Sequence, residues 1–431
     1  MALRDIFKKC FVGYTKNSSI LGFKQMTDPN TSITKRLAWL LVFGLMCGIG
    51  GYFLWYLWFG SLSSPLIVNM ESSMYPISKI EFPAVAICNI NIISKTALLE
   101  LERNIFKTNV SGNITFSRIR QLGRLLDYSY DVDIESFLHE EFLNNNDGVK
   151  YEPKVISTMK KLAPKCKEML LLCFWAGKKV DCESIFDIRR TNKGFCCTFN
   201  YILNYNAAGT PSKRISQVKR QYYPGPLFGL NLLIDPLIED YTYTTRPGQG
   251  VEILIFEPTH YADPNSGRVS QRFVQPGQFL QLGLKSIKQV ATPEVRKYNP
   301  ETRKCLFRDE RKKEYEDMYS YSACIYNCRI KAIHALCGCT PYAFPIVSDK
   351  PTCTLNDLSC LDKIKERLLL IYPIGSKNTE GLDREFQESL YCPQCHPDCE
   401  FTKHESQATK INYQHQYIKT LKLHRFLTLQ S

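Results

Sequence analysis

The chain has 431 residues, of which 44% are hydrophobic and 23% are charged, and this composition excludes a disordered tail and a collagen-like repeat. Eighteen cysteines are far too many for a reduced cytosolic enzyme without metal clusters. A formal net charge of +13 is typical of nucleic-acid-binding proteins, but most of it falls in residues 1–36 and 401–431. Because no basic stripe interleaved with aromatic residues lies between these two ends, we predict that nucleic acid is not a partner.

An apolar segment near the N-terminus has the length of a membrane-spanning helix. Leu37–Phe59 is nearly all apolar, and no charged residue occurs from position 37 to position 70. A helix of this length extends over about 34 Å, which is enough for a bilayer core of about 30 Å. A buried soluble helix and a cleaved signal peptide are the alternatives. The N-terminal extension is too long for a signal peptide, and both ends of the segment carry interfacial tryptophans, namely Trp39, Trp55 and Trp58.

The basic residues before this segment predict its orientation. Lysine and arginine in excess mark the cytosolic side of a span, and two basic residues directly precede this one. We therefore predict a cytosolic N-terminus, a span over residues 37–59 and an extracellular domain after it. Within the span, Gly44 and Gly48 form a GxxxG pattern, which by itself is weak evidence for helix packing.

Most of the cysteines follow the predicted span. Cys10 precedes it and Cys47 lies within it, so the other sixteen, an even number, meet an oxidising compartment in which disulfides persist. Cys392-Pro-Gln-Cys395-His396 also matches the c-type haem attachment pattern, and together with Cys399 it offers four ligands for zinc. We favour disulfides, because a short CxxCH pattern arises easily where cysteines are dense. We therefore predict no metal site and no cofactor.

The pattern of residues changes along the predicted extracellular part. Ile80–Ile93 is rich in β-branched and apolar residues and predicts a strand, whereas residues 96–146 are polar and helical in pattern. Two sequons in this polar stretch, at Asn109 and Asn113, predict glycosylation. Residues 185–290 carry most of the turn signals and short apolar runs, which predict antiparallel sheet.

The cysteine-rich segment that follows contains a predicted helix and no pattern for enzyme chemistry. Lys313–Leu336 has a helical pattern, in which Cys324 and Cys328 share one face. GxSxG, HExxH and P-loop motifs do not occur in the chain. We therefore predict no catalytic residues and no enzyme activity.

An acidic stretch lies between positions 127 and 141. Within it, Asp131–Glu135 is similar to the start of a calcium-binding loop, but Ser136 occupies the position that requires glycine. We interpret the stretch as a solvated helix face. A proton- or cation-sensing cluster is the alternative.

Several short motifs occur in the order and spacing of a known family. They run from position 18 to position 400 and comprise Ser18-Ser-Ile-Leu-Gly22-Phe, Phe82-Pro-Ala-Val-Ala-Ile-Cys88-Asn-Ile-Asn, Lys193-Gly-Phe-Cys-Cys-Thr-Phe-Asn200, Arg303-Lys-Cys305-Leu-Phe, Cys324-x3-Cys328, Cys337-Gly-Cys339-Thr-Pro and Tyr391-Cys-Pro-Gln-Cys-His-Pro-Asp-Cys399. With these motifs the chain resembles the degenerin/epithelial sodium channel (amiloride-sensitive sodium channel) family, and most closely its insect pickpocket branch.

The resemblance implies an α+β membrane protein of the plasma membrane, with one N-terminal transmembrane helix and a disulfide-rich extracellular domain. That domain would have the form of a clenched hand, with a β-sheet palm, a β-ball, a helical finger and a disulfide-stapled helical thumb. The implied segments are a cytosolic N-terminus (1–36), the transmembrane helix (37–59), the start of the palm (60–94), the finger (95–184), the palm, β-ball and knuckle (185–304), the thumb (305–400) and a truncated basic tail (401–431).

The resemblance also implies disulfide pairs that the sequence alone cannot choose. In the thumb they are nested rungs between an outgoing and a returning chain, namely Cys305–Cys399, Cys324–Cys395, Cys328–Cys392, Cys337–Cys360 and Cys339–Cys353. Elsewhere the implied pairs are Cys88–Cys196 and Cys173–Cys182. Cys166 and Cys197 remain, and we expect them to pair with each other.

Two departures from the family pattern concern function. Family members carry a His-Gly dipeptide before the first span that influences gating, whereas this chain has Leu21-Gly22. Gly22 is thus a remnant of the gating motif that keeps the backbone freedom without the imidazole. Family members also have a second membrane helix that carries the pore, but Ile411–Ser431 contains no span. Loss of the palm strands that lead to that helix would leave a sheet edge unpaired.

We therefore interpret the chain as a subunit of a ligand- or stimulus-gated, amiloride-sensitive sodium channel, truncated before the pore helix. Its partners would be sodium ions within a complete channel, related subunits in a homo- or hetero-trimer, and membrane lipid. The alternatives are a single-span, non-conducting regulatory subunit that modifies full-length relatives, and a fragment with no stable product. Alone, the chain is expected to carry no current, because Leu37–Phe59 has no ionisable or amide side chain that could replace the hydration shell of an ion.

Overall fold

The structure, a computed structural model, divides into two compact units. One unit comprises Met1–Glu71 and Pro293–Arg303, and the other comprises Ser72–Thr292 and Lys304–Ser431. The residues that the structure describes are 2–19, 22, 24–25, 28, 30–63, 66–107, 116–144, 154–203, 215–266, 268–310, 318–344, 351–373 and 380–412.

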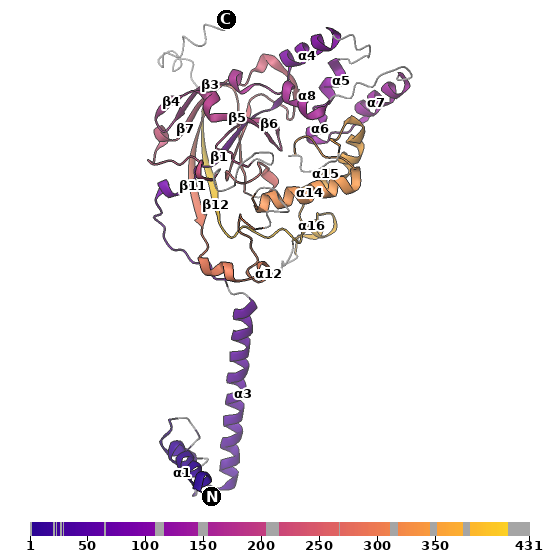
Figure 1. The fold of residues 1–431 in the computed structure, drawn as a ribbon. Helices are drawn as coiled ribbons and strands as arrows, with labels where there is room; N and C mark the ends of the chain where they lie inside the picture. The colour runs from indigo at the N-terminus through magenta and orange to yellow at the C-terminus, as the bar shows by residue number, and fades with distance from the viewer. Residues whose placement is uncertain are drawn as a thin grey trace. The chain divides into compact units, whose positions relative to one another are not determined.

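The first unit contains the N-terminal helices α1 (Ala2–Asn17) and α3 (Ile33–Ser63), together with the short elements η5 (Pro293–Lys297) and α12 (Pro300–Arg303) (Figure 1). Among the described residues, one helix is long and apolar enough to cross a membrane, and this is α3, with a mean hydropathy of 2.0. The expected span of residues 37–59 lies inside α3. The helix is longer than the span because no proline interrupts it between Ile33 and Ser63.

A five-stranded antiparallel sheet forms the centre of the second unit. Its order is β10–β9–β1–β6–β5, with β1 at Ala84–Asn89, β5 at Phe186–Thr191, β6 at Gly194–Phe199, β9 at Val251–Phe256 and β10 at Ser270–Val274. β1 is the middle strand, and all six of its residues are buried. Both of its faces are therefore covered, which is why its sequence is a continuous apolar run.

Three smaller antiparallel sheets complete this unit. They are formed by β2 (Asn91–Ser94) with β8 (Tyr241–Thr244), by β3 (Leu170–Trp175) between β4 (Lys178–Val180) and β7 (Leu230–Ile234), and by β11 (Gln278–Gln289) with β12 (Phe401–Asn412). The single strand expected at Ile80–Ile93 is thus two strands, β1 and β2. The chain turns between them because the Asn89 side chain accepts from the Asn91 amide at 3.0 Å and donates to the Pro236 carbonyl at 2.7 Å.

The first part of the segment expected as a C-terminal tail, Phe401–Asn412, forms strand β12. This strand pairs with β11 along its whole length, from Phe401 opposite Gln289 to Asn412 opposite Gln278. The hydrophobic pattern misses β12 since its inward-facing residues are polar, namely Thr402, His404 and Ser406. Residues 413–431 lie outside the described part of the chain.

Five helices form a group beside the sheets (Figure 1), namely α4 (Lys95–Lys107), α5 (Phe116–Gln121), α6 (Arg124–Asp127), α7 (Val132–Asn144) and α8 (Val155–Leu162). One apolar core joins them to β2, and it includes Leu98, Leu125, Ile134 and Leu162. The segment that is similar to a calcium loop is the start of α7, where the Asp131 carboxylate accepts from the Ile134 amide at 3.1 Å.

The segment 95–184, expected as a helical finger, is helical only in its first part. After α8 along the chain, it contains α9 (Cys166–Met169), strands β3 and β4, and α10 (Cys182–Ile185). β3 pairs with β7, which lies about sixty residues further along the chain. The short apolar run of β3 has the length of a strand, so this part belongs with the sheets.

The third group of helices is α14 (Tyr321–Cys337), α15 (Leu358–Leu369) and α16 (Asp383–Gln387). α14 begins at Tyr321, where the Ser320 hydroxyl caps it by accepting from the Ala323 amide at 3.2 Å. It ends at Gly338, whose φ of 71° is the left-handed conformation that glycine adopts without strain. Of the expected helix Lys313–Leu336, residues 311–317 lie outside the described part.

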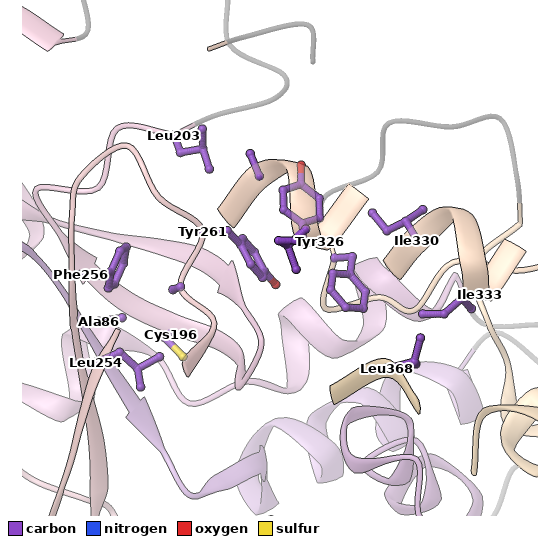
Figure 2. Close-up of a cluster of buried hydrophobic side chains, with 14 of the residues drawn as sticks. Ala86, Cys196, Leu203, Leu254, Phe256, Tyr261, Tyr326, Ile330, Ile333 and Leu368 are labelled. Atoms are coloured by element: carbon purple, nitrogen blue, oxygen red, sulfur yellow. The ribbon is translucent and has the colours of Figure 1, made fainter. Parts of the chain in front are cut away.

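The largest apolar core joins the central sheet to α14. Figure 2 shows Leu254 and Phe256 of β9 on one side of Tyr261, and Tyr326 of α14 on its other side. The rings of Tyr261 and Tyr326 are 5.0 Å apart, and the Tyr261 hydroxyl donates to the Ala343 carbonyl at 2.9 Å. Burial raises the pKa of Tyr261 far above its ordinary value, so the hydroxyl stays a neutral donor. Sheet and helix are therefore one packed body in this region.

Candidate functional site: the junction of α14 and β12

Eight disulfides link the second unit: the seven pairs that the family resemblance implies, and the pair that we expected between the two remaining cysteines, Cys166 and Cys197. The Cα–Cα distances lie between 4.6 and 6.2 Å, within the range of ordinary disulfides. The bridges are Cys88–Cys196, Cys166–Cys197, Cys173–Cys182, Cys305–Cys399, Cys324–Cys395, Cys328–Cys392, Cys337–Cys360 and Cys339–Cys353. The remaining cysteines, Cys10 and Cys47, are free and exposed.

The CxxCH pattern does not form a cofactor site in this structure. Cys392 bridges to Cys328 and Cys395 bridges to Cys324, so neither sulfur is a free thiolate that could hold haem or zinc. No group of three or more His, Cys, Asp and Glu side chains suited to a metal ion occurs within the described ranges.

Two adjacent cysteines of β6 connect its sheet to different neighbours. Side chains alternate between the faces of a strand, so Cys196 and Cys197 point in opposite directions. Cys196 lies in the core shared with α14, and Cys197 lies in a second core formed with β3. Cys166 in α9 reaches Cys197, which fixes the β3 hairpin to the central sheet.

The returning chain meets α14 and the central sheet at Asp398, the residue before Cys399. The buried carboxylate accepts three hydrogen bonds: from the Tyr321 amide at 2.9 Å, from the Arg268 guanidinium at 2.6 Å and from the His260 imidazole at 3.3 Å. Burial alone would raise the pKa of Asp398, but His260 and Arg268 hold this pKa below its ordinary value. The carboxylate is therefore ionised and links the first turn of α14 to the loop after β9.

A second carboxylate in the same loop binds the start of β12. Glu257 is 3% exposed, and it accepts from the Thr402 amide at 3.2 Å and pairs with the Arg308 guanidinium. The Nδ1 atom of His260 lies 3.2 Å from the same carboxylate. Since His260 contacts both Glu257 and Asp398, it connects the two carboxylates through one imidazole.

A third buried carboxylate holds the middle of α14. Asp263 forms an ion pair with Arg329, and both side chains are about 5% exposed or less. Asp263 also accepts from the Asn192 amide group at 3.1 Å. The same loop contacts the first turn of α14, where the Ser322 hydroxyl accepts from the Tyr261 amide at 3.0 Å. Ser322 and Arg329 lie more than one helical turn apart, so the loop holds α14 at two separate points.

β12 carries one further buried titratable group, His404. Its Nδ1 atom lies 2.8 Å from the Ser286 hydroxyl of β11, whereas its Nε2 atom has no hydrogen-bond partner among the described residues. Burial lowers the pKa of His404 to about 4; Glu81 opposes this shift and His260 adds to it. The imidazole is therefore neutral at physiological pH and becomes costly to bury when it gains a proton.

The junction is defined here as Glu257, His260, Asp263, Asp398 and His404 with their basic partners. Its buried charges hold three chain segments together in a low-dielectric environment, so a movement of one segment is coupled to the positions of the other two. Sequence reasoning missed it because buried polar residues give no hydrophobic period. One signal was present: the segment directly after strand β9 contains Glu257, His260 and Asp263 within seven residues.

The other expected site residues lie outside this junction. Gly22 has a φ of +92°, a conformation that residues with a side chain rarely adopt. A Cβ atom at this position would also lie only 2.8 Å from the Trp39 ring, so both the backbone conformation and the available space require glycine. Its neighbour Leu21 lies outside the described residues, as do Asn109 and Asn113.

The chain is similar to known proteins over most of its length. The profile of the family described as "amiloride-sensitive sodium channel" matches residues 14–428. Pickpocket protein 28 of Drosophila melanogaster is 25% identical over 427 residues, which cover 92% of this chain and 64% of the relative. Sodium channel protein Nach of Drosophila ananassae is 26% identical over 369 residues, which cover 83% of this chain and 67% of the relative. The bile acid-sensitive ion channel of Rattus norvegicus is 25% identical over 324 residues, covering 71% and 53%.

These matches decide what kind of protein this is. The chain spans between about half and two thirds of the length of these relatives. The match to the family extends over nearly the whole chain, and the insect relatives confirm the similarity to the pickpocket branch. The fold class is confirmed too: an α+β membrane protein with an N-terminal apolar helix and a disulfide-rich extracellular domain. The chain belongs to the amiloride-sensitive sodium channel family.

Proposed function

We propose that the protein is a subunit of an amiloride-sensitive sodium channel in the plasma membrane. The observation that carries this proposal is the family match over residues 14–428, which includes both the apolar helix and the disulfide-linked domain. The names of the Nach relatives describe sodium channel proteins, and that of a snail relative describes a peptide-activated, amiloride-sensitive sodium channel. Sodium ions would pass through an assembled homo- or hetero-trimer with related subunits.

We assign the parts of the extracellular domain as follows. The five-stranded sheet and the β11–β12 ladder correspond to the palm, and the β3–β4–β7 sheet corresponds to the β-ball. The helices α4 to α8 correspond to the finger, and α14 to α16 with their five bridges correspond to the thumb. This assignment moves the boundary between finger and β-ball from residue 184 to about residue 165, and it moves β12 from the tail into the palm.

The junction offers a route by which a stimulus sensed in the thumb reaches the palm. Asp398 is hydrogen-bonded to the first amide of α14, and three residues later Phe401 begins β12. A displacement of α14 must therefore move the start of β12 or break buried, charge-assisted hydrogen bonds. Breaking such bonds costs several kcal/mol, so moving the strand is the less costly response. The gating stimulus would act through this link.

The proposed topology places the N-terminus in the cytosol and the disulfide-rich domain outside. The lysines and arginines before α3 support the first placement, and sixteen bridged cysteines support the second. Asn109 and Asn113 are then the accessible sequons of the finger.

The test is co-expression of the chain with Pickpocket protein 28, with affinity purification and whole-cell recording from the same cells. The two chains are expected to co-purify, and the amiloride-sensitive sodium current is expected to differ from that of the relative alone. A His139→Asn variant, which changes an exposed residue of α7, serves as a control and is expected to behave as the unchanged chain. The proposal fails if the chain reaches the cell surface but neither co-purifies nor changes the current.

A further inference from the structure

Helix α1 exposes an apolar stripe that nothing in its own unit covers. Ile6, Phe7, Phe11 and Tyr14 are between 54% and 75% exposed, and Cys10 in their middle is exposed as well. At 3.6 residues per turn these five positions lie within an arc of about 140° on one side of the helix. A stripe of this width is the apolar face of an amphipathic helix.

Thr15 and Lys9 are two described residues of α1 that lie outside the apolar stripe. Thr15 is 2% exposed, and its hydroxyl donates to the Val12 carbonyl of the same helix. Lys9 is exposed and lies away from the apolar stripe. The helix carries four basic residues against one acidic residue, namely Arg4, Lys8, Lys9, Lys16 and Asp5.

The connection to α3 keeps α1 close to a bilayer. The chain runs from Asn17 at the end of α1 to Ile33 at the start of α3, a separation of 16 residues (33 minus 17). Even when fully extended, such a connection spans about 55 Å at most. A bilayer crossed by α3 is therefore always within reach of α1, at a high effective concentration.

We propose that α1 lies in the membrane interface, with its apolar stripe among the acyl chains and its basic residues at anionic headgroups. The length of the connection and the positive charge favour lipid over a protein partner, because both pair this face with a surface that is always near it and of opposite charge. In the topology proposed above, this surface is the cytoplasmic leaflet, which is the leaflet that carries anionic lipid. The helix thereby anchors the N-terminal segment that leads to Gly22 and the span.

Cys10 allows the contact between α1 and the membrane to be measured with a fluorescent label. The other sixteen cysteines are bridged, so a Cys47→Ala variant of the whole chain leaves Cys10 as the single free thiol. A polarity-sensitive fluorophore on Cys10 would sit in the centre of the apolar stripe. The labelled chain is placed in lipid nanodiscs of phosphatidylcholine, with and without phosphatidylserine, and probed with aqueous iodide and with a spin-labelled lipid as quenchers.

The expected result is strong quenching by the spin-labelled lipid and protection from iodide, with both effects greater when phosphatidylserine is present. Replacing the two aromatic residues (Phe7→Ala and Phe11→Ala) keeps the helix propensity but removes apolar area, and should shift the population toward water by about tenfold. A Lys9→Gln variant should reduce the dependence on phosphatidylserine and leave the quenching in phosphatidylcholine unchanged. Free access of iodide in both lipids overturns the proposal, and so does protection from both quenchers, because a protein surface would then cover the stripe.

Discussion

Asp398 is a single residue on which three segments of the extracellular domain depend. Its carboxylate accepts from the α14 backbone, from Arg268 and from His260, and all of these bonds are made away from water. A neutral amide of the same shape keeps part of the geometry, but it loses the charge that its basic partners require. Removing one member of a buried, charged network typically costs about 3–5 kcal/mol.

We predict that Asp398→Asn lowers the thermal unfolding temperature of the purified protein by several degrees, since each 1 kcal/mol shifts it by about 2–4 °C in domains of 150–250 residues. Glu405→Gln is the matched control, because Glu405 lies on β12 but is exposed and forms an ion pair with the exposed Lys403. This control is expected to unfold at the temperature of the unchanged protein. Equal unfolding temperatures for Asp398→Asn and Glu405→Gln would show that the junction does not stabilise the domain.

The sequons at Asn109 and Asn113 test the orientation of the whole chain at the scale of single residues. Glycans are added only on the outer side, whereas the sequons at Asn17 and Asn30 precede the span. We predict that deglycosylation of protein made in membranes increases its gel mobility, and that an Asn109→Gln, Asn113→Gln double variant abolishes this change. A mobility change that persists in the double variant would place another sequon outside and contradict the topology.

At the scale of elements, the thumb bridges differ in the length of chain that they close. Cys305–Cys399 closes 94 residues, and Cys339–Cys353 closes 14. The next rung, Cys324–Cys395, stays closed when the first bridge is removed, so in the oxidised protein that bridge closes a loop of only about 23 residues (94 minus 71). The chain-entropy description then gives about 3.4 kcal/mol of stabilisation for the first bridge and about 3 kcal/mol for the second. We therefore predict that replacing both cysteines of the first pair by serine destabilises the protein more than the same change in the second pair. Guanidinium titrations of the two variants measure the difference, and the reverse order would reject the entropic account for this domain.

The pairing of β12 with β11 should depend on pH through His404. The pKa of this imidazole is about 4 in the folded protein and about 6.5 when unfolded, so below pH 6.5 the unfolded chain binds a proton that the folded chain excludes. Stability is thus complete above pH 6.5 and falls as the pH falls toward 4, with a loss of about 2 kcal/mol at pH 5. Two other titratable groups act on His404: Glu81, which is half-buried, and His260 of the junction.

We predict that His404→Asn reduces the loss of stability between pH 7 and pH 5, because an amide keeps the contact with Ser286 and does not titrate. His139→Asn is the control, since His139 is exposed on α7. Thermal unfolding of the two variants at both pH values measures the effect. An identical pH dependence in both would remove His404 as its cause.

The elements also show how far the sequence could be interpreted before the structure. β1 and α3 were predictable because a long apolar run is stable only as a buried strand or a membrane-spanning helix. The individual disulfide pairs were predictable only with the help of the family resemblance. β12 was not, because its inward side chains Thr402, His404 and Ser406 are polar and pair with buried charges. The junction was missed for the same reason. Hydrophobic periodicity identifies apolar side chains that are buried, whereas the polar side chains of the junction are buried because each has a hydrogen-bond or ion-pair partner.

At the scale of the whole molecule, we expect α3 to contribute to assembly rather than to ion selection. Between Leu37 and Ser63 it has no charged or amide side chain, so a bundle of such helices offers ions nothing in place of water. It does offer small residues: the space where Cβ atoms of Gly44 and Gly48 would lie is open to at least 4 Å. Another helix can therefore approach the α3 backbone closely along this line.

We predict that the double variant Gly44→Leu, Gly48→Leu assembles less well with itself and with Pickpocket protein 28, because the leucines hold the helices apart. Gly50→Leu is the matched control, since position 50 lies on a different side of the helix. A loss of about 1.4 kcal/mol per helix contact would reduce co-purification about tenfold. The sodium-to-potassium permeability ratio of the remaining current should equal that of the control, because the selective path lies elsewhere. A shifted reversal potential in the double variant would instead place α3 on the ion path.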